Sequence, residues 1–222
     1  MNNYGQVARG RESALATNKV LRNTYMLLSM SLIFSGVMAG VSMAVGISQG
    51  MALGSIIGAF VLVWLVLPRF ENSTAGIFVV FAFTGLMGLS LGPMLSYYLA
   101  IPNGGNTVMT ALGGTGVIFL GLSGYVLTTR KDFSFMGGFL FVGLLVILGA
   151  AILNIFFSIP AFSLAISSGI ILLMSGFILF DTSRIIHGGE TNYIRATVSL
   201  YLNIHNLFVN LLYILGAFSG DD

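Results

Sequence analysis

The chain has 222 residues, of which only 7% are charged, and its mean hydropathy is +0.97. Soluble proteins carry about 25% charged residues, so this composition indicates an integral membrane protein with no room for a soluble domain beside spans of about 20 residues each. The absence of cysteine excludes disulfides and thiolate metal sites. The net charge of +2 resides in short loops, so we expect membrane lipid and no nucleic acid as a partner.

Residues 1–23 form a polar, basic tail, and the first apolar run begins only after it. That run is longer than the roughly 7–15 apolar residues of a signal peptide, so we expect it to remain as the first span. Together with six further apolar runs it predicts an all-α transmembrane domain over 24–218, followed by a short C-terminal tail at 219–222. The seven predicted helices are 24–46, 51–68, 75–100, 107–128, 135–157, 160–181 and 196–218.

Every lysine and arginine lies in the tail or in one of three connections, at 69–71, 130–132 and 182–195. The other three connections carry no charge. Because basic loops remain in the cytoplasm, the N-terminus is predicted to be cytoplasmic and, after seven spans, the C-terminus periplasmic. A re-entrant last helix, which would return the C-terminus to the cytoplasm, stays open as an alternative.

Glycines recur at four-residue spacing in the predicted helices, as Gly36/Gly40, Gly54/Gly58 and Gly88/Gly92. Such pairs let helices approach closely in lipid. Packing within the chain is the preferred interpretation, and a dimer interface is the alternative.

Polar side chains form a stripe along the last predicted helix. Ser199, Asn203, Asn206 and Asn210 fall within about 60° of one another on a helix, while His205 lies on the opposite face. Polar groups on two faces predict a central helix surrounded by the others. The stripe serves either for hydrogen bonds between helices or for lining a transport cavity.

Asp181 directly follows the sixth apolar run. The sequence DTSRIIH is predicted to extend this helix until Gly188 and Gly189 stop it, which places Asp181 near the cytoplasmic boundary. Arg184, three residues on, is a candidate partner. Asp181 is then either an interfacial acid paired to arginine or a titratable latch that closes a cytoplasmic entrance.

The remaining polar residues of the membrane region are interpreted structurally. His205 and Asn154 are predicted to hydrogen-bond to neighbouring helices. His187 and Glu190 are predicted to be solvated or capping groups, because too few ligands surround them for a metal. We predict no metal site and no cofactor.

Catalysis is the least favoured interpretation. The GLSG sequence around Ser123 has the form found in intramembrane serine proteases, with His205 as the candidate base. Aspartyl protease chemistry needs two carboxylates, and Asp181 stands alone. The chain contains neither HExxH nor a phosphate-binding glycine loop, so we predict that the protein is not an enzyme.

Several segments carry a resemblance to a known family: VLRNTYMLLS at 20–29, FAFTG and LGP within 81–93, YVLTTRKDFSFMGG at 125–138, IIHGGETNYIRATVSLY at 185–201 and LFVNLLYILGAF at 207–218. Together they resemble the transmembrane Bax-inhibitor-motif family, and within it the bacterial YccA branch, over essentially the whole chain. The branch implies an inner-membrane protein that binds and restrains the membrane AAA protease FtsH.

The resemblance also implies a seven-helix fold whose seventh helix is central. Some family members are pH-sensitive calcium leak channels, in which two aspartates on the last two helices form the sensor. The first matches Asp181 and the second matches Asn203, while an arginine near the end of the second helix matches Arg69. An aspartate–asparagine pair cannot share a proton between two carboxylates or offer calcium two charges. The resemblance therefore favours protease modulation, with a leak for calcium or protons as the alternative.

Overall fold

The computed structural model describes the backbone of residues 3–219, and side chains at Leu15 and from Thr17 to Ser219. Within that range seven helices are long and apolar enough to cross a membrane, which confirms the predicted all-α fold and the number of spans. The elements are α1 (Asn3–Val45), α2 (Gln49–Val61), the π turn η1 (Leu62–Val66), α3 (Leu67–Phe70), α4 (Ala75–Ala100), α5 (Gly104–Thr129), the 3₁₀ turn η2 (Ser134–Met136), α6 (Gly137–Phe157), α7 (Pro160–Ile186) and α8 (Tyr193–Ser219).

The helix ends follow from local sequence. α2, η1 and α3 make one span. The π turn ends at Val66, two residues before Pro68, whose nitrogen cannot donate to the carbonyl four residues back. α7 continues through Asp181 to Ile186, and Gly188 follows with φ of 75°, so the predicted extension of this helix is confirmed.

α1 begins at Asn3, and its apolar part is Thr17–Val45. The arginines predicted for the tail at Arg9 and Arg11 have side chains outside the described residues.

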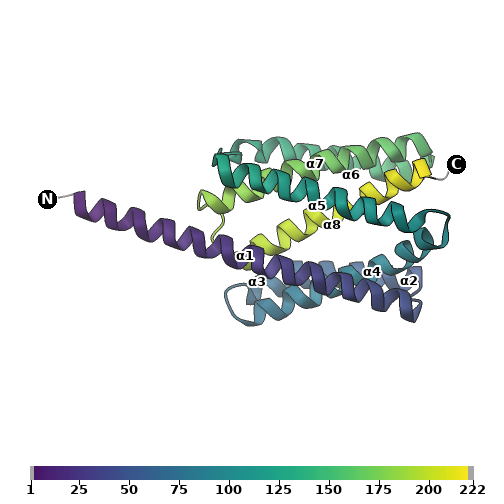
Figure 1. Ribbon diagram of the computed structural model, residues 1–222, viewed down its shortest axis with the longest axis horizontal. Helices are drawn as coiled ribbons and strands as arrows, with labels where there is room; N and C mark the ends of the chain where they lie inside the picture. Colours follow the sequence, from purple (N-terminus) through teal and green to yellow (C-terminus); the bar gives the residue numbers. More distant parts are fainter. Residues whose placement is uncertain (1–2, 220–222) are drawn as a thin grey trace.

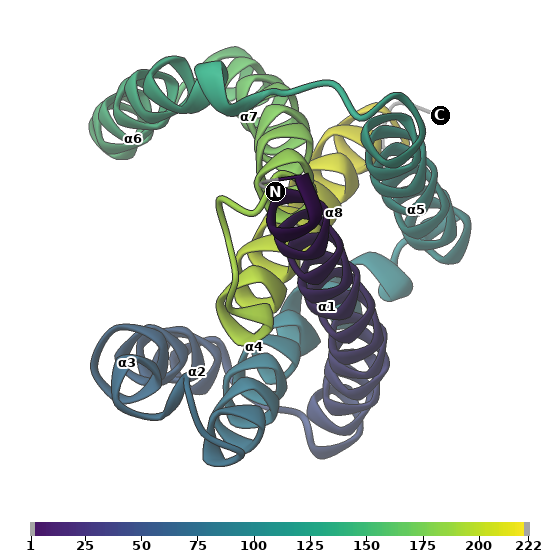
Figure 2. The same ribbon diagram turned by 90° about the vertical axis from the view of Figure 1, so that its left-hand side faces the viewer.

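The core of the bundle lies around α8 (Figures 1 and 2). This helix packs against α1, α4, α5 and α7. Half of its most apolar 18-residue window is buried, against 6% for α6. α2 packs on α4 and α6 packs on α7, so these two helices lie at the periphery and turn most of their surface outward.

The interface of α1 with α4 supplies a hydrogen bond that Pro93, inside α4, cannot make. Proline has no N–H to donate to the carbonyl of Leu89. The Ser42 hydroxyl of α1 donates to that carbonyl instead, at 2.7 Å. Gly92 makes the approach possible, because a Cβ at this position would collide with the Ser42 hydroxyl. Gly88 packs in the same way on Ser35, so the prediction of close packing is confirmed for this glycine pair.

The packing prediction is wrong for three other glycines. A Cβ added at Gly36, Gly40 or Gly54 would meet nothing within 4 Å among the described residues, whereas one at Gly58 would lie 3.3 Å from a methyl group of Leu86. The face of α1 that carries Gly36 and Gly40 therefore borders open space instead of a neighbouring helix. This space is part of a groove whose floor is α8.

Candidate functional site

Asp181 lies at the junction of α7 and α8 with two hydrogen-bond donors. Its Oδ2 accepts from Ser199 Oγ at 2.6 Å and from Asn203 Nδ2 at 2.8 Å. The two donors are four residues apart on α8 and so share one face. The carboxyl is buried, with 9% of the residue exposed. The structure thus brings together Asp181 and the first two members of the predicted stripe.

Arg184 does not pair with this acid. Its Nη2 donates to the carbonyl of Gly189 at 3.0 Å, and its guanidinium lies 5.5 Å from the ring centroid of Phe180. Among the described residues, the ion pairs join only Arg195 to Glu71 and to Glu190. The interpretation of Asp181 as an acid paired to arginine is therefore wrong, and its direct partners are neutral.

A small hollow of about 40 Å³ separates Asp181 from the charged connection between α7 and α8. Arg184, Glu190 and Arg195 line it together with Ser199. Arg195 lies 3.2 Å from Glu190 and 3.4 Å from Glu71, and only 14% and 16% of those acidic side chains are exposed. Ion-paired residues thus line a hollow that reaches Asp181.

Arg69 lies apart from this cluster. It is exposed on α3, and its Nη1 donates to the carbonyl of Leu65 one turn earlier, at 2.5 Å. It does not line the hollow beside Asp181. The structure therefore does not bring the three predicted latch residues into one site.

The rest of the stripe bonds within its own helix. Asn206 donates to the carbonyl of Leu202, and Asn210 donates to that of Asn206, both at 2.8 Å. Hydrogen bonding between helices, one of the two alternatives for the stripe, therefore holds for Ser199 and Asn203, whereas the side chains of Asn206 and Asn210 fold back one turn.

Asn154 and His205, the two other polar residues predicted within the membrane, differ in their hydrogen bonds. Asn154 of α6 donates to Ser163 Oγ of α7 at 2.7 Å, as expected of a contact between helices. His205 is half-buried and makes no hydrogen bond to the described residues, and its ring lies 5.9 Å from that of Tyr201 on the same helix.

A cluster around His187 was predicted only in part. His187 caps α7, which is one of the two predicted roles, with Nδ1 2.9 Å from the carbonyl of Ser183. Its contact with another loop, where Nε2 lies 3.1 Å from the carbonyl of Arg130, was not predicted. The Ser183 hydroxyl accepts from the Phe133 N–H at 2.8 Å and lies 3.3 Å from Asp132 Oδ1. This cluster joins the connection after α5 to the end of α7. A predictable part was the turn in which Asp132 accepts the N–H two residues later.

Hydrogen bonds lower the pKa of Asp132 below its ordinary value of 3.8. The largest contribution comes from the Ser134 side chain, followed by the Ser134 backbone N–H. The Ser183 hydroxyl and the nearby His187 act in the same direction. The carboxylate form of Asp132 is therefore the form that holds this turn together.

Comparison with known proteins places this architecture in a family. The family described as "Inhibitor of apoptosis-promoting Bax1" matches residues 17–220, which covers all seven spans. The chain belongs to the Bax inhibitor family. It is 50% identical over 211 residues, 95% of both chains, to a protein of Escherichia coli K12 named "Modulator of FtsH protease YccA". A protein of Escherichia coli O6:H1 with the same identity is named "Inner membrane protein YccA". An "Uncharacterized membrane protein" of Vibrio cholerae is 54% identical over 95% of both chains.

The protease-like serine of this Bax inhibitor family member is engaged elsewhere. Ser123 is buried, and its hydroxyl lies 3.4 Å from that of Thr182, which in turn lies 3.4 Å from Tyr25 Oη. His205 lines a different region with Ser35 and Thr115. The arrangement contains no hydrogen bond between Ser123 and His205 among the described side chains, so it offers no nucleophile–base pair.

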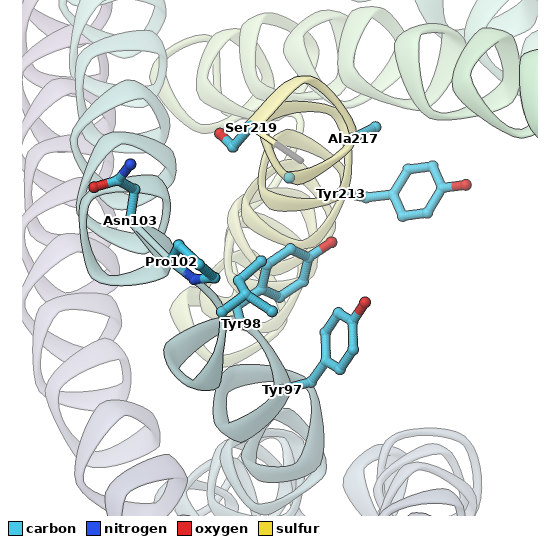
Figure 3. Close-up of a pocket in the computed structure, with 9 residues that line it drawn as sticks. Tyr97, Tyr98, Pro102, Asn103, Tyr213, Ala217 and Ser219 are labelled. Carbon is cyan, nitrogen blue, oxygen red and sulfur yellow. The ribbon is translucent and has the colours of Figure 1, made fainter. Parts of the chain in front are cut away.

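The opposite end of the bundle carries a tyrosine-lined hollow of about 580 Å³ (Figure 3). Tyr97 and Tyr98 come from α4 and Tyr213 from α8, and Asn103 lies at the connection to α5. None of its lining residues is charged. Tyrosine is typical of the membrane–water interface, so among the described residues this family member has a charged end and an aromatic end.

Proposed function

We propose that this protein binds FtsH and restrains it in the bacterial inner membrane, without catalysing a reaction itself. The observation that carries the proposal is the identity of 50% over 95% of both chains to the relative named as a modulator of this protease. Seven membrane-length helices fit an inner-membrane protein. The uncoupled Ser123 and His205 fit the absence of catalysis.

The charged end of the bundle is the end that we place in the cytoplasm. The loops that carry the basic residues contact one another there. The carbonyl of Arg130 lies 3.1 Å from His187 Nε2, and Asn192 donates to the carbonyl of Glu71 at 2.9 Å. Basic loops are retained in the cytoplasm. The N-terminal tail at 1–23 would then be cytoplasmic and the C-terminus, at 219–222, periplasmic.

This orientation supplies a mechanism. α1 extends well past the bundle toward the N-terminus (Figure 1), so the tail is available to a protease that acts from the cytoplasm. The bundle behind it is closely packed, with Gly88 and Gly92 in contact with α1. We infer that the protease engages the tail, extracts the bundle slowly and is occupied meanwhile.

The test is affinity purification from membranes combined with substrate turnover. We expect FtsH to co-purify, and overexpression to lengthen the half-life of its membrane substrates. A matched chain that lacks residues 1–16, which precede the first span at Thr17, should lose both effects. Unchanged turnover in cells where the complex is confirmed would contradict the proposal.

A second function, a proton-sensitive cation leak, is favoured by one observation. The single carboxylate within the spans, Asp181, lies below a hollow that an ion-paired loop covers. Protonation of Asp181 would remove the charge that accepts from Ser199 and Asn203, and so loosen α7 from α8 at this point. In this role Asp181 and Asn203 form the latch, and Arg69, which lies apart, has no part.

Ion flux into liposomes separates the two functions. If the latch operates, Asp181→Asn should abolish the dependence of flux on pH, and Asn203→Asp should increase it by restoring a second carboxylate. Ser168→Ala, at an exposed position on α7, the helix of Asp181, serves as the control and should leave the flux unchanged. A flux that is indifferent to pH and to all three changes would exclude the leak and leave the protease proposal standing.

A further inference from the structure

A groove of about 330 Å³ runs along α8 between α1 and α5. These two helices both pack on α4 and α8, but within the described residues they do not pack on each other. Figure 1 shows α8 crossing between them. Leu99 and Leu112 line the groove and are each 50% exposed. The groove therefore opens sideways, toward the lipid.

The width of the groove comes from α1. Gly36 and Gly40 line it, and a side chain at either position would meet nothing within 4 Å. Opposite them α8 contributes Tyr201, His205 and Phe208. The space is therefore a slot between the glycines of α1, which have no side chain, and the aromatic and imidazole rings of α8. Its volume lies at the lower end of the range for small-molecule sites, about 300–1,000 Å³.

His205 is the one polar group of this slot whose hydrogen bonds are unaccounted for among the described residues. Tyr201 Oη is 2.6 Å from Ser35 Oγ and donates to the carbonyl of Thr84 at 3.4 Å. Thr115 donates to the carbonyl of Ala111 at 2.7 Å. The His205 ring lies tilted at 30° to the ring of Tyr201, and its nitrogens have no hydrogen-bond partner among the described side chains and backbone groups. A polar group left unbonded in hydrocarbon costs several kcal/mol, so the site favours a partner for this imidazole.

The depth of His205 restricts that partner. It lies midway along the 27-residue α8, and thus near the middle of a hydrocarbon layer about 30 Å thick. The headgroup of a phospholipid cannot reach this depth, and its acyl chains have no group that bonds to an imidazole. Water requires two to four polar partners, which a slot lined mainly by carbon does not supply.

We propose that this groove binds an uncharged, lipid-soluble carbonyl compound with a flat ring, of the quinone type, whose carbonyl accepts a hydrogen bond from His205. A carbonyl carries no donor that would remain unbonded in the bilayer, so such a molecule reaches the middle of the membrane at low cost. Its ring fits the slot between Gly36 and Gly40 on one side and Tyr201 and Phe208 on the other. This site is separate from Asp181 and does not depend on protease modulation.

The test uses solid-state NMR of the whole protein in proteoliposomes, with ¹⁵N-labelled histidine. The chain has two histidines, so His187 is an internal control outside the membrane. The probe is decylubiquinone, and the matched probe is decylbenzene, which has an alkyl chain and a ring but no carbonyl. We expect decylubiquinone to shift the His205 ring resonance saturably, His187 to stay unchanged, and decylbenzene to leave both unchanged.

Two variants define the site. Gly36→Leu fills the slot and should abolish the shift, whereas Gly121→Leu, at another glycine with open space around it, should retain it. His205→Phe should weaken binding of decylubiquinone about tenfold, measured by displacement of a radiolabelled probe, because one hydrogen bond in an apolar site is lost. Absence of a saturable shift, an equal response to both probes, or equal binding by the Gly36→Leu protein would each overturn the proposal.

Discussion

Asp181 is the only acidic residue within the described spans, and its environment is built from neutral donors. A hydrogen bond to a charged group contributes about 1.5–3 kcal/mol, so the two bonds to Asp181 strengthen the attachment of α7 to α8 at this point. Asp181 thereby holds α7 to α8 close to the charged connection that joins the two helices.

Asn203→Ala is expected to reduce the free energy of unfolding by about 2 kcal/mol, because it removes a donor from a buried carboxylate. The same change in an Asp181→Ala background should cost less, since the bond is then already absent. Chemical unfolding of the four proteins in detergent measures this coupling. Equal costs in the two backgrounds would show that the hydrogen bond contributes nothing to stability.

Asp132 makes the connection after α5 sensitive to acid. Its pKa is lowered in the folded protein, chiefly by the Ser134 side chain. A lowered pKa means that the carboxylate stabilises the fold fully above its ordinary value of 3.8 and that this stabilisation is lost as pH falls through the lower folded value. Asp132→Asn should remove that dependence, because an amide oxygen still accepts from the Ser134 N–H.

The measurement is the thermal unfolding temperature from pH 7 down to pH 2. Below pH 3.8 the wild-type protein should lose stability more steeply than the Asp132→Asn protein. Parallel curves for the two proteins would mean that Asp132 does not hold the turn.

Among the elements, α4 receives from α1 a hydrogen bond that its own backbone cannot make. Its central proline would leave the carbonyl of Leu89 without a helical partner, and Ser42 supplies one from outside the helix. Ser42→Ala should cost about 1–2 kcal/mol, because an acceptor in the membrane region loses its donor. The loss should shrink in a Pro93→Ala background, where position 93 regains the N–H. Equal losses in both backgrounds would exclude this account of the interface.

Sequence periodicity and hydropathy predict the elements well but the packing only in part. The apolar runs locate all seven spans, and Gly188 marks the end of α7 as expected. The glycine pairs look alike in the sequence, yet Gly88 and Gly92 pack on α1 while Gly36 and Gly40 border a groove. The difference depends on which faces neighbouring helices cover, and a one-dimensional pattern does not contain that information.

The site was predictable to a similar extent. Helical spacing and the family resemblance together single out Asp181 with Ser199 and Asn203, and these three residues meet. Helical spacing does not reveal that Asn206 and Asn210 bond within their own helix, because a side-chain rotamer decides it. Nor does it reveal the contact of His187 with Arg130, which joins positions 57 residues apart.

At the scale of the whole molecule, the two ends of the bundle differ in chemistry. The charged loops meet at one end, and tyrosines line a hollow at the other. The proposed orientation predicts which loops are accessible from which side of the membrane. Since the chain has no cysteine, single cysteines can be placed without background. Ser73→Cys should react with an impermeant maleimide only from the cytoplasm, and Asn103→Cys only from the periplasm. The opposite pattern would contradict the orientation.

The peripheral helices give the molecule a broad apolar surface, while its one conspicuous projection is the start of α1 (Figure 1). That shape fits a protein whose N-terminus a membrane protease binds but whose helices it extracts slowly. In the proposed function, this chain therefore slows FtsH by occupying it.

The most direct measurement is the rate at which purified FtsH degrades a membrane substrate in proteoliposomes, with and without this protein. We predict a slower rate that falls further as the ratio of this protein to FtsH rises, and a restored rate with the chain that lacks residues 1–16. An unchanged rate while the two proteins remain bound to each other would contradict the account.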